Sequence, residues 1–233
     1  MGYSRKEDLA KIRKERKEAK IARKRNRDTR EKLVRFLIVC EGTKTEPHYF
    51  KALVKNYTST VREVSIEGEG MATVALVNKT LEIKNDLERQ NAMRFDRIWV
   101  VFDKDDFSDF NDAIKIANKL GFNCAWTNEA FELWYILHFE YLNTAISRAD
   151  YIKKIEDIFR EKMNCPKFIY QKGNPDIYNL LKQYGQEDLA KKFAKKLRNL
   201  YKDTNYAIHN PCTQIDLLVN ELEQPESLLI KNN

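Results

Sequence analysis

The chain has 233 residues, of which 42% are hydrophobic and 33% are charged. This is enough for one sizeable core, and the 7 glycines and 5 prolines exclude a collagen-like or low-complexity architecture. No apolar run approaches the roughly 20 residues of a membrane-spanning helix, so we expect no membrane partner. The N-terminus has no apolar leader and the cysteines are isolated, which favours a cytoplasmic location.

The positive charge is concentrated at one end of the chain. Residues 1–35 hold 15 Lys/Arg and 6 Asp/Glu, a net of +9, whereas the other 198 residues hold 27 and 29, a net of −2. We predict a basic N-terminal arm over residues 1–32, helical or disordered, because this segment has almost no apolar stripe. A basic arm on a near-neutral body often contacts nucleic acid, and a solvated helix of mixed charge is the alternative.

The chain then alternates between strand and helix patterns. Residues 33–40 form a nearly continuous β-prone run, which is typical of a strand buried on both faces of a parallel sheet. Further strands are predicted at 61–66, 97–102 and 122–126, with helices at 46–55, 72–89 and 107–120. This alternation predicts an α/β core with a parallel sheet over residues 33–145.

After residue 128 the pattern becomes helical. Helices are predicted at 129–141, 148–162, 174–184, 186–201 and 211–223. No Gly/Ser-rich linker separates these helices from the sheet. We therefore assign residues 146–233 to a C-terminal helical region that packs on the core.

Glu41 is the first candidate for a functional residue. It directly follows the first predicted strand and is followed by Gly42. In open α/β sheets, ligands bind beyond the carboxyl ends of the strands, and a glycine there allows the backbone to approach a phosphate closely. An ordinary loop glutamate is the alternative interpretation.

A second acidic group follows the third predicted strand, at Asp103, Asp105 and Asp106. Residues two apart in an extended segment face the same side, so Asp103 and Asp105 are expected to point to one site. Adjacent carboxylates repel each other unless a proton or a cation lies between them, and oxygen ligands suit Mg²⁺ or Mn²⁺. The alternative is that Asp105 and Asp106 cap the following helix.

A glutamate after the first strand and an Asp-x-Asp after a later one resemble the Toprim pattern of topoisomerases, primases and OLD-type nucleases. Four blocks in order then resemble the RloB-like family, at residues 39–50, 101–105, 128–139 and 210–213. The resemblance covers about residues 33–222. The pair Glu129-Ala130 departs from the commoner family form, and the basic arm lies outside the pattern.

This resemblance implies a Toprim-like core and a metal-dependent nuclease. It implies Glu41 as the general acid/base, and Asp103, Asp105 and Glu41 as ligands of Mg²⁺ or Mn²⁺. RloB-like proteins are associated with restriction loci and abortive-infection phage defence, often beside an ATPase. Nucleic acid and an ATPase are therefore the expected partners, with DNA and RNA both open as substrates.

Four further residues are candidates for supporting roles. Lys44 is placed to hold a substrate phosphate, with a solvated lysine as the alternative. His48 lies near Glu41 on the first predicted helix and is a second candidate for contact with the substrate phosphate. Glu129 and Glu132 are three apart on a predicted helix and would share a face, where they would complete a second metal site or support the first. The alternative function is a catalytically silent Toprim-fold module that docks an ATPase or nucleic acid.

Overall fold

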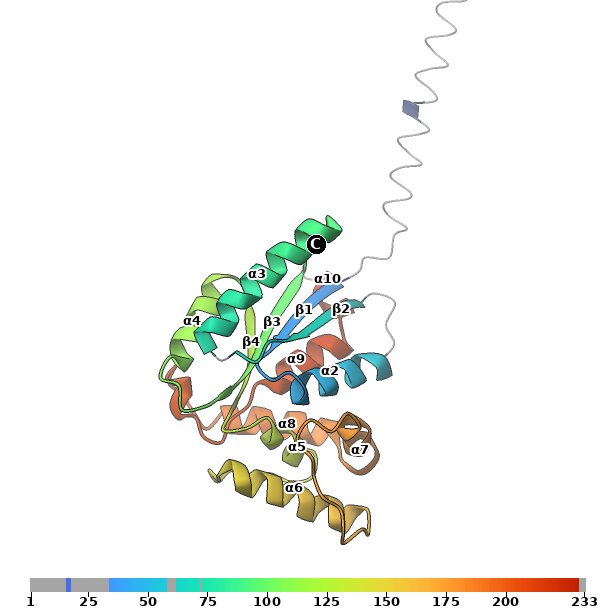
Figure 1. The fold of residues 1–233 in the computed structure, drawn as a ribbon, viewed down its shortest axis with the longest axis vertical. Coiled ribbons are helices and arrows are strands. Elements are labelled where there is room, and N and C mark those ends of the chain that lie inside the picture. The colour runs from blue at the N-terminus through green and yellow to red at the C-terminus, as the bar shows by residue number, and fades with distance from the viewer. Residues whose placement is uncertain (1–15, 18–33, 58–61, 72, 231–233) are drawn as a thin grey trace, which may run out of the picture. The chain divides into compact units, whose positions relative to one another are not determined.

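The computed structural model describes residues 16–17, 34–57, 62–71 and 73–230 (Figure 1). The chain divides into two compact units, Met1–Leu33 and Val34–Asn233. In the first unit, Arg16 and Lys17 are described, and both are helical and exposed. The rest of the predicted arm lies outside the described residues.

A parallel sheet lies at the centre of the second unit. Its strands are β1 (Val34–Cys40), β2 (Arg62–Gly68), β3 (Arg97–Lys104) and β4 (Asn123–Asn128), in the order β2-β1-β3-β4. Every pairing is parallel, with Ile38 opposite Ile66 on one side and Trp99 on the other. The predicted α/β fold is confirmed, and the arrangement is consistent with a Toprim-like core.

Helices cover both faces of this sheet. Figure 1 shows α3 (Thr73–Asn91) and α4 (Phe110–Lys119) on one face, with α2 (Thr45–Asn56) and α9 (Ile215–Glu223) on the other. The remaining helices are α5 (Glu132–Leu137), α6 (Arg148–Lys162), α7 (Ile177–Tyr184), α8 (Glu187–Arg198), the 3-10 helix η1 (Tyr206–Ile208) and α10 (Glu226–Ile230).

The alternation of side chains along β1 divides the apolar residues into two cores. Phe36 and Ile38 point into a core shared with α2 and α5 to α9, whereas Leu37 and Val39 point into a core shared with α3 and α4. All four side chains are fully buried. Among the C-terminal helices, α9 contacts β4 and α10 contacts β1, whereas α6, α7 and α8 pack on other helices of the same core.

Several predicted helices are shorter in the structure, and for two of them the backbone shows the reason. The helix predicted from residue 129 begins at Glu132, because Glu129 has a φ of 73°, which is incompatible with a right-handed helix. The last predicted helix begins at Ile215 rather than Pro211. The backbone there pairs with β4 instead, through bonds from Asn128 N to the Cys212 carbonyl and from Gln214 N to the Trp126 carbonyl.

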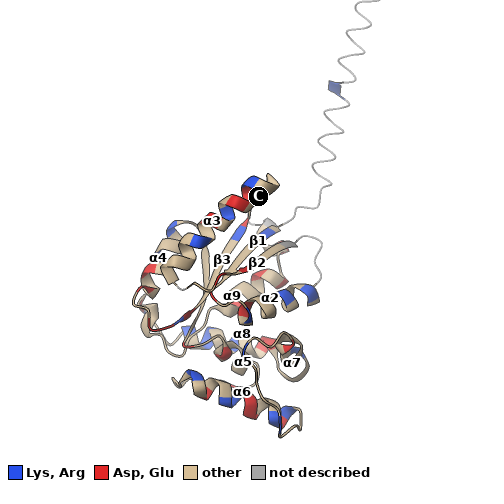
Figure 2. Ribbon diagram, viewed as in Figure 1, with Lys and Arg blue, Asp and Glu red and all other residues tan. Residues whose placement is uncertain are grey.

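Charges of both signs occur on the same helices of the second unit, as on α3 and α6 in Figure 2. This mixture agrees with the near-neutral sequence that follows the basic arm. Among the described helices, none combines the length and the apolar character that crossing a membrane requires.

Candidate active site

Glu41 and Asp103 meet at the carboxyl end of the parallel sheet. The Glu41 amide extends the ladder between β1 and β3 by bonding to the Val101 carbonyl, at 2.8 Å. The Glu41 carboxylate then accepts a hydrogen bond from the Asp103 amide, at 3.0 Å. Asp103 itself accepts a bond from the Phe131 amide, at 3.1 Å. Parallel pairing thus brings together two carboxylates that are 62 positions apart in the sequence.

Two more carboxylates surround this pair. Glu46 lies in the first turn of α2 and is 6% exposed, and its Oε2 has no hydrogen-bond partner among the described residues. Glu132 is the first residue of α5 and is 2% exposed. Its Oε1 accepts a bond from the Tyr170 hydroxyl, at 3.1 Å. The site therefore gathers four acidic side chains from four different elements or their ends.

Burial and mutual repulsion both act against ionisation at this site. Burial raises the pKa of Asp103 well above its usual value, and the charges of Glu46, Glu132 and Glu41 raise it further. The pKa values of Glu41 and Glu46 are also raised, in each case mainly by burial. Such a cluster is most stable when a proton or a cation offsets part of its charge.

Three of the four carboxylates, those of Glu41, Glu46 and Asp103, line a pocket of about 380 Å³ at the end of the sheet. Its lining combines the carboxylates with basic side chains and the backbone of the turn after β1: Glu41, Gly42, Thr43, Lys44, Thr45, Glu46, Asp103, Asp105, Arg148 and Lys172. The cations come from three separate segments, since Arg148 begins α6 and Lys172 lies in the loop before α7. The pocket thus offers acidic groups beside cations suited to phosphate oxygens.

Asp105 lies in the same pocket but has a different environment from Asp103. Strand β3 ends at Lys104, so Asp105 follows the strand rather than extending it. Its carboxylate forms an ion pair with Arg148. The structure therefore brings Asp105 near the cluster, and its role as a metal ligand stays a prediction.

Lys44 lies in the pocket lining and is exposed, whereas His48 does not line the pocket. The His48 Nδ1 lies 2.9 Å from the Gly173 carbonyl. This contact joins α2 to the loop that carries Lys172. His48 is thus placed to position the loop of a pocket residue, and its contact with a substrate phosphate stays a prediction.

The prediction that Glu129 and Glu132 share a helix face is wrong. Glu129 precedes α5 in a left-handed conformation, and it lines a neighbouring pocket with Asn128 and Asn210. Glu132 remains with the cluster around Asp103, because it is among the charges that raise the pKa of Asp103.

Comparison with protein families gives a match to the RloB-like proteins over residues 36–222. The match includes every pocket residue and extends from β1 into α9. This chain belongs to the RloB-like family. No significant match is found among curated proteins or among solved structures.

The pocket of this RloB-like protein fits a hard divalent cation in its chemistry. Among the described residues, no group of three or more acidic, histidine or cysteine side chains is arranged as a metal site. The donors present are nevertheless all carboxylate oxygens, and one of them, the buried Glu46 Oε2, lacks a partner within the described part of the chain. Mg²⁺ and Mn²⁺ prefer such oxygen ligands. Glu41, Glu46 and Asp103 are the residues that would hold the ion.

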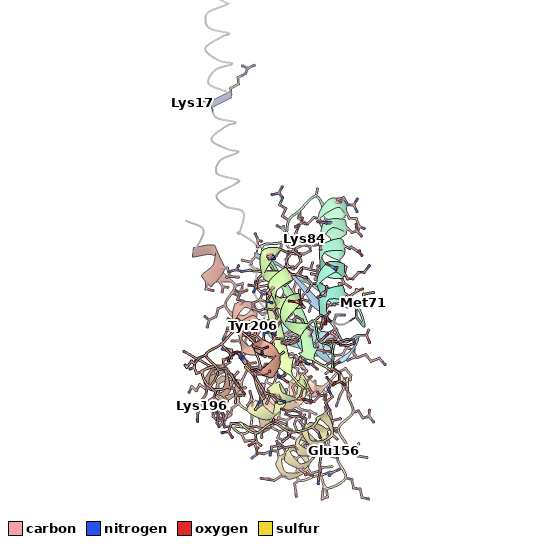
Figure 3. The ribbon with its side chains drawn as sticks, turned by 90° about the vertical axis from the view of Figure 1, so that its left-hand side faces the viewer. Lys17, Met71, Lys84, Glu156, Lys196 and Tyr206 are labelled. Carbon is pink, nitrogen blue, oxygen red and sulfur yellow. The ribbon has the colours of Figure 1, made fainter. Side chains whose placement is uncertain are left out.

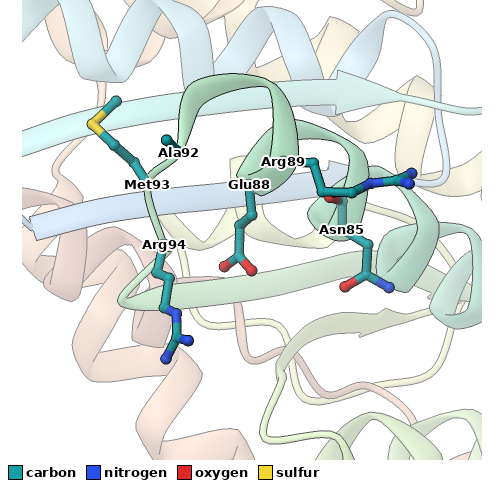
Figure 4. A pocket seen from close by; sticks show the side chains of 6 residues that line it. All are labelled: Asn85, Glu88, Arg89, Ala92, Met93 and Arg94. Atoms are coloured by element: carbon teal, nitrogen blue, oxygen red, sulfur yellow. The ribbon is translucent and has the colours of Figure 1, made fainter.

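A separate pocket of the RloB-like chain, of about 600 Å³, lies at the opposite end of the sheet, away from the carboxylates (Figure 4). It is formed by the last turns of α3 and the residues before β3. Its carboxylate, Glu88, is held by Lys84, at 2.9 Å, and by the Phe95 amide, at 3.0 Å. Glu88 is therefore engaged in holding the connection between α3 and β3, unlike the carboxylates around Asp103.

Three charged residues of the pocket around Asp103 are not among the candidates predicted from the sequence: Glu46, Arg148 and Lys172. The position of Glu46 in the site could have been predicted from the sequence. It shares the spacing of Tyr49, Phe50 and Leu53 on the buried face of α2, and a carboxylate in such a stripe needs a polar partner. Arg148 and Lys172 carry no comparable signal, because they reach the pocket through tertiary packing.

Proposed function

We propose that this RloB-like protein is a nuclease that hydrolyses phosphodiester bonds with Mg²⁺ or Mn²⁺ as cofactor. The observation that supports the proposal most strongly is the hydrogen-bonded pair of Glu41 and Asp103 at the carboxyl edge of the sheet. A raised carboxyl pKa is typical of residues that exchange protons in catalysis, and both residues have one.

In this mechanism, Asp103, Glu46 and Glu41 would hold the cation. When bound, such an ion neutralises charge on the phosphoryl oxygens and lowers the pKa of an attacking water. Glu41 is the acid/base of this mechanism, because it lies at the carboxyl edge of the sheet beside Asp103, and burial raises its pKa in the metal-free site. The same group in its protonated form can donate to the leaving oxygen.

The cations of the pocket orient the substrate. Lys44 and Lys172 lie at its exposed margin, where they can bind phosphates on either side of the scissile bond. Arg148 is shared between Asp105 and the pocket. We propose that a substrate phosphate competes with Asp105 for Arg148, which would free Asp105 for the cation.

Membership of the RloB-like family supports a role in defence. On that basis we propose that the nuclease is an effector of an abortive-infection system and works with an ATPase. The substrate is a nucleic acid, and the basic arm adds affinity for it through phosphate contacts.

A catalytically silent binding module is the second candidate. It is favoured by the ion pair between Asp105 and Arg148, which compensates one acidic group without any metal. In this interpretation, the remaining buried carboxyl groups stay partly protonated, and the pocket serves only to dock nucleic acid or an ATPase.

Cleavage assays with the full chain separate the two candidates. The purified protein is incubated with single- and double-stranded DNA and RNA, in Mg²⁺, in Mn²⁺ and in chelator, with and without a candidate ATPase partner. We expect cleavage that requires the divalent cation and is lost in Asp103→Asn. Exposed Glu82 is a matched control site, and Glu82→Gln should cleave normally. Binding of nucleic acid without cleavage under every condition would favour the silent module.

A further inference from the structure

A second pocket adjoins the carboxylate cluster, and its chemistry differs from that of the cluster. It has a volume of about 620 Å³, within the range of small-molecule sites, and lies beyond the ends of β3 and β4. Asp105 and Arg148 line both pockets, so the two spaces meet at this ion pair. A ligand group bound here would be close to a phosphate bound at Glu41.

Two exposed apolar side chains line the second pocket. Phe107 is 53% exposed and Ile208 is 64% exposed, whereas most large apolar side chains of this unit are buried. Phe107 precedes α4, and Ile208 ends the 3-10 helix η1. A ligand that covers these two side chains would gain free energy, because it would remove apolar surface from water. Flat aromatic ligands such as nucleobases are commonly held against side chains of this kind.

The segment that carries Ile208 is firmly held. Asn111 forms two hydrogen bonds at the start of η1. Its Nδ2 donates to Asn205 Oδ1, at 2.6 Å, and its Oδ1 accepts from the Ala207 amide, at 3.1 Å. The buried Asn128 donates to the Ala207 carbonyl, at 3.2 Å. Tyr206, which is labelled in Figure 3, packs on the Trp126 ring with 5.7 Å between centroids. These contacts hold the backbone of the segment, so Ile208 has a fixed position at the edge of the pocket.

The polar lining of the pocket contains cations and acceptors: Lys104 and Arg148 both contact Asp105, whereas Glu129 and Asn210 carry acceptor oxygens. Asn210 donates its Nδ2 to Glu129 Oε1, at 3.4 Å. This orientation leaves its buried Oδ1 without a partner among the described residues. Glu129 itself is held in a left-handed conformation, with a φ of 73°, an unfavourable state for a glutamate that must be stabilised by its surroundings. A complementary ligand must therefore supply several donors.

We propose that this second pocket binds a guanine base of the nucleic acid, next to the scissile phosphate. The Watson–Crick edge of guanine carries an N1–H and an amino group side by side, which matches the two oxygens of a carboxylate. The corresponding edge of each other base includes a ring or carbonyl acceptor at one of these places, which would face Glu129 unfavourably. Phe107 and Ile208 then cover the apolar surface of the base. The inference names the substrate preference of the proposed nuclease and rests on that function.

Binding of the four nucleoside 5′-monophosphates to the full chain tests this proposal. They share the phosphate and sugar and differ only in the base, so differences in affinity report on this pocket. The measurement is made in chelator by calorimetry or ligand-observed NMR. We expect GMP to bind about 10-fold more tightly than the others, since a bidentate hydrogen-bonded contact to a base edge discriminates against the wrong base by at least roughly that factor.

Three variants test whether GMP binds in this pocket. Phe107→Ala and Ile208→Ala should each weaken GMP binding about 10-fold, and both sites are exposed, so folding should be preserved. Glu129→Gln should reduce GMP to the affinity of the other nucleotides. Leu120→Ala is the matched control, because Leu120 is 38% exposed at the other end of α4.

Equal affinity for the four nucleotides, or GMP binding unchanged in Phe107→Ala and Ile208→Ala, would overturn the proposal. Undetectable binding of all four at millimolar concentration would do the same. Because these measurements involve no cleavage, they fail or succeed independently of the nuclease assay. A chain that cleaves nucleic acid but shows no preference for GMP would retain the proposed nuclease and lose the guanine pocket.

Discussion

Asp103 has the least favourable environment for a charge in the candidate site. Its burial and the three neighbouring carboxylates raise its pKa well above that of an exposed aspartate. In the unfolded chain it ionises near its ordinary value, so the unfolded state loses its proton first as the pH rises. The stability contribution of this residue is therefore present at acid pH and is lost as the pH rises toward the pKa of the folded state.

We expect Asp103→Asn to raise the melting temperature of the metal-free protein by a few degrees at neutral pH. The amide removes one of the repelling charges, and its oxygen can still accept the bond from the Phe131 amide. Mg²⁺ or Mn²⁺ should raise the melting temperature of the wild type and have a smaller effect on the variant. The measurement is thermal unfolding at neutral pH with and without cation.

The same variant should lose this advantage at acid pH, where Asp103 is protonated in the wild type. A melting temperature of Asp103→Asn below that of the wild type at neutral pH would contradict the electrostatic account of this residue. Glu82→Gln, at an exposed position on α3, is the control and should have little effect.

At the scale of the elements, the position of Glu41 depends on close packing between β2 and the turn after β1. A Cβ added at Gly68 would lie 2.7 Å from the Gly42 carbonyl and 2.9 Å from Thr43 Cα. Both neighbours are backbone atoms, so the turn itself would have to move. The chain therefore uses a glycine at the end of β2 to set the turn that holds Glu41.

We expect Gly68→Ala to destabilise the protein by about 1–3 kcal/mol, the usual cost of overpacking, and to lower its nuclease activity. Ser65→Ala on the same strand is the control and should change both quantities much less. Denaturant unfolding and cleavage rates provide the readouts. Wild-type activity in a Gly68→Ala protein would show that the turn is not needed in its present position.

The strands could be predicted because each is marked by a short run of apolar residues in the sequence. Residues 34–40 and 97–102 are apolar runs that the sheet buries on both faces, and the carboxyl ends of parallel strands must meet at one edge. This rule brings Glu41 to Asp103 without knowledge of any contact. Fold class and the centre of the site thus follow from sequence patterns alone.

The C-terminal part was harder to predict, because tertiary contacts override local propensity there. Residues 211–214 have helical spacing but pair with β4, and Glu129 is held in a left-handed conformation that no sequence period indicates. Arg148 and Lys172 reach the site only through the packing of α6 and the loop before α7. Such positions depend on the assembled fold.

For the molecule as a whole, the basic arm is the main source of net charge. Residues 1–32 hold 14 Lys/Arg and 6 Asp/Glu, a net of +8, compared with +7 for the entire chain. Deleting them should weaken nucleic-acid binding and flatten its dependence on salt, because fewer counterions are released. Binding titrations at several salt concentrations measure both effects.

The rate of cleavage per bound substrate should be unchanged by this deletion, since the pocket lies entirely within residues 34–233. Equal affinity and equal salt dependence in the shortened and full-length chains would remove the arm from nucleic-acid binding. A protein partner would then be the better candidate for the arm.

The central claim is that Glu41 transfers a proton in metal-dependent cleavage at the end of the sheet. Single-turnover cleavage by Glu41→Gln, compared with the wild type at saturating Mg²⁺ or Mn²⁺ and with any required ATPase present, tests it most directly. Gln keeps the size of the side chain and its bond from the Asp103 amide, but it cannot take up a proton. We expect a rate lower by about 10²–10⁴, with substrate affinity nearly unchanged. Cleavage by Glu41→Gln at the wild-type rate would contradict it.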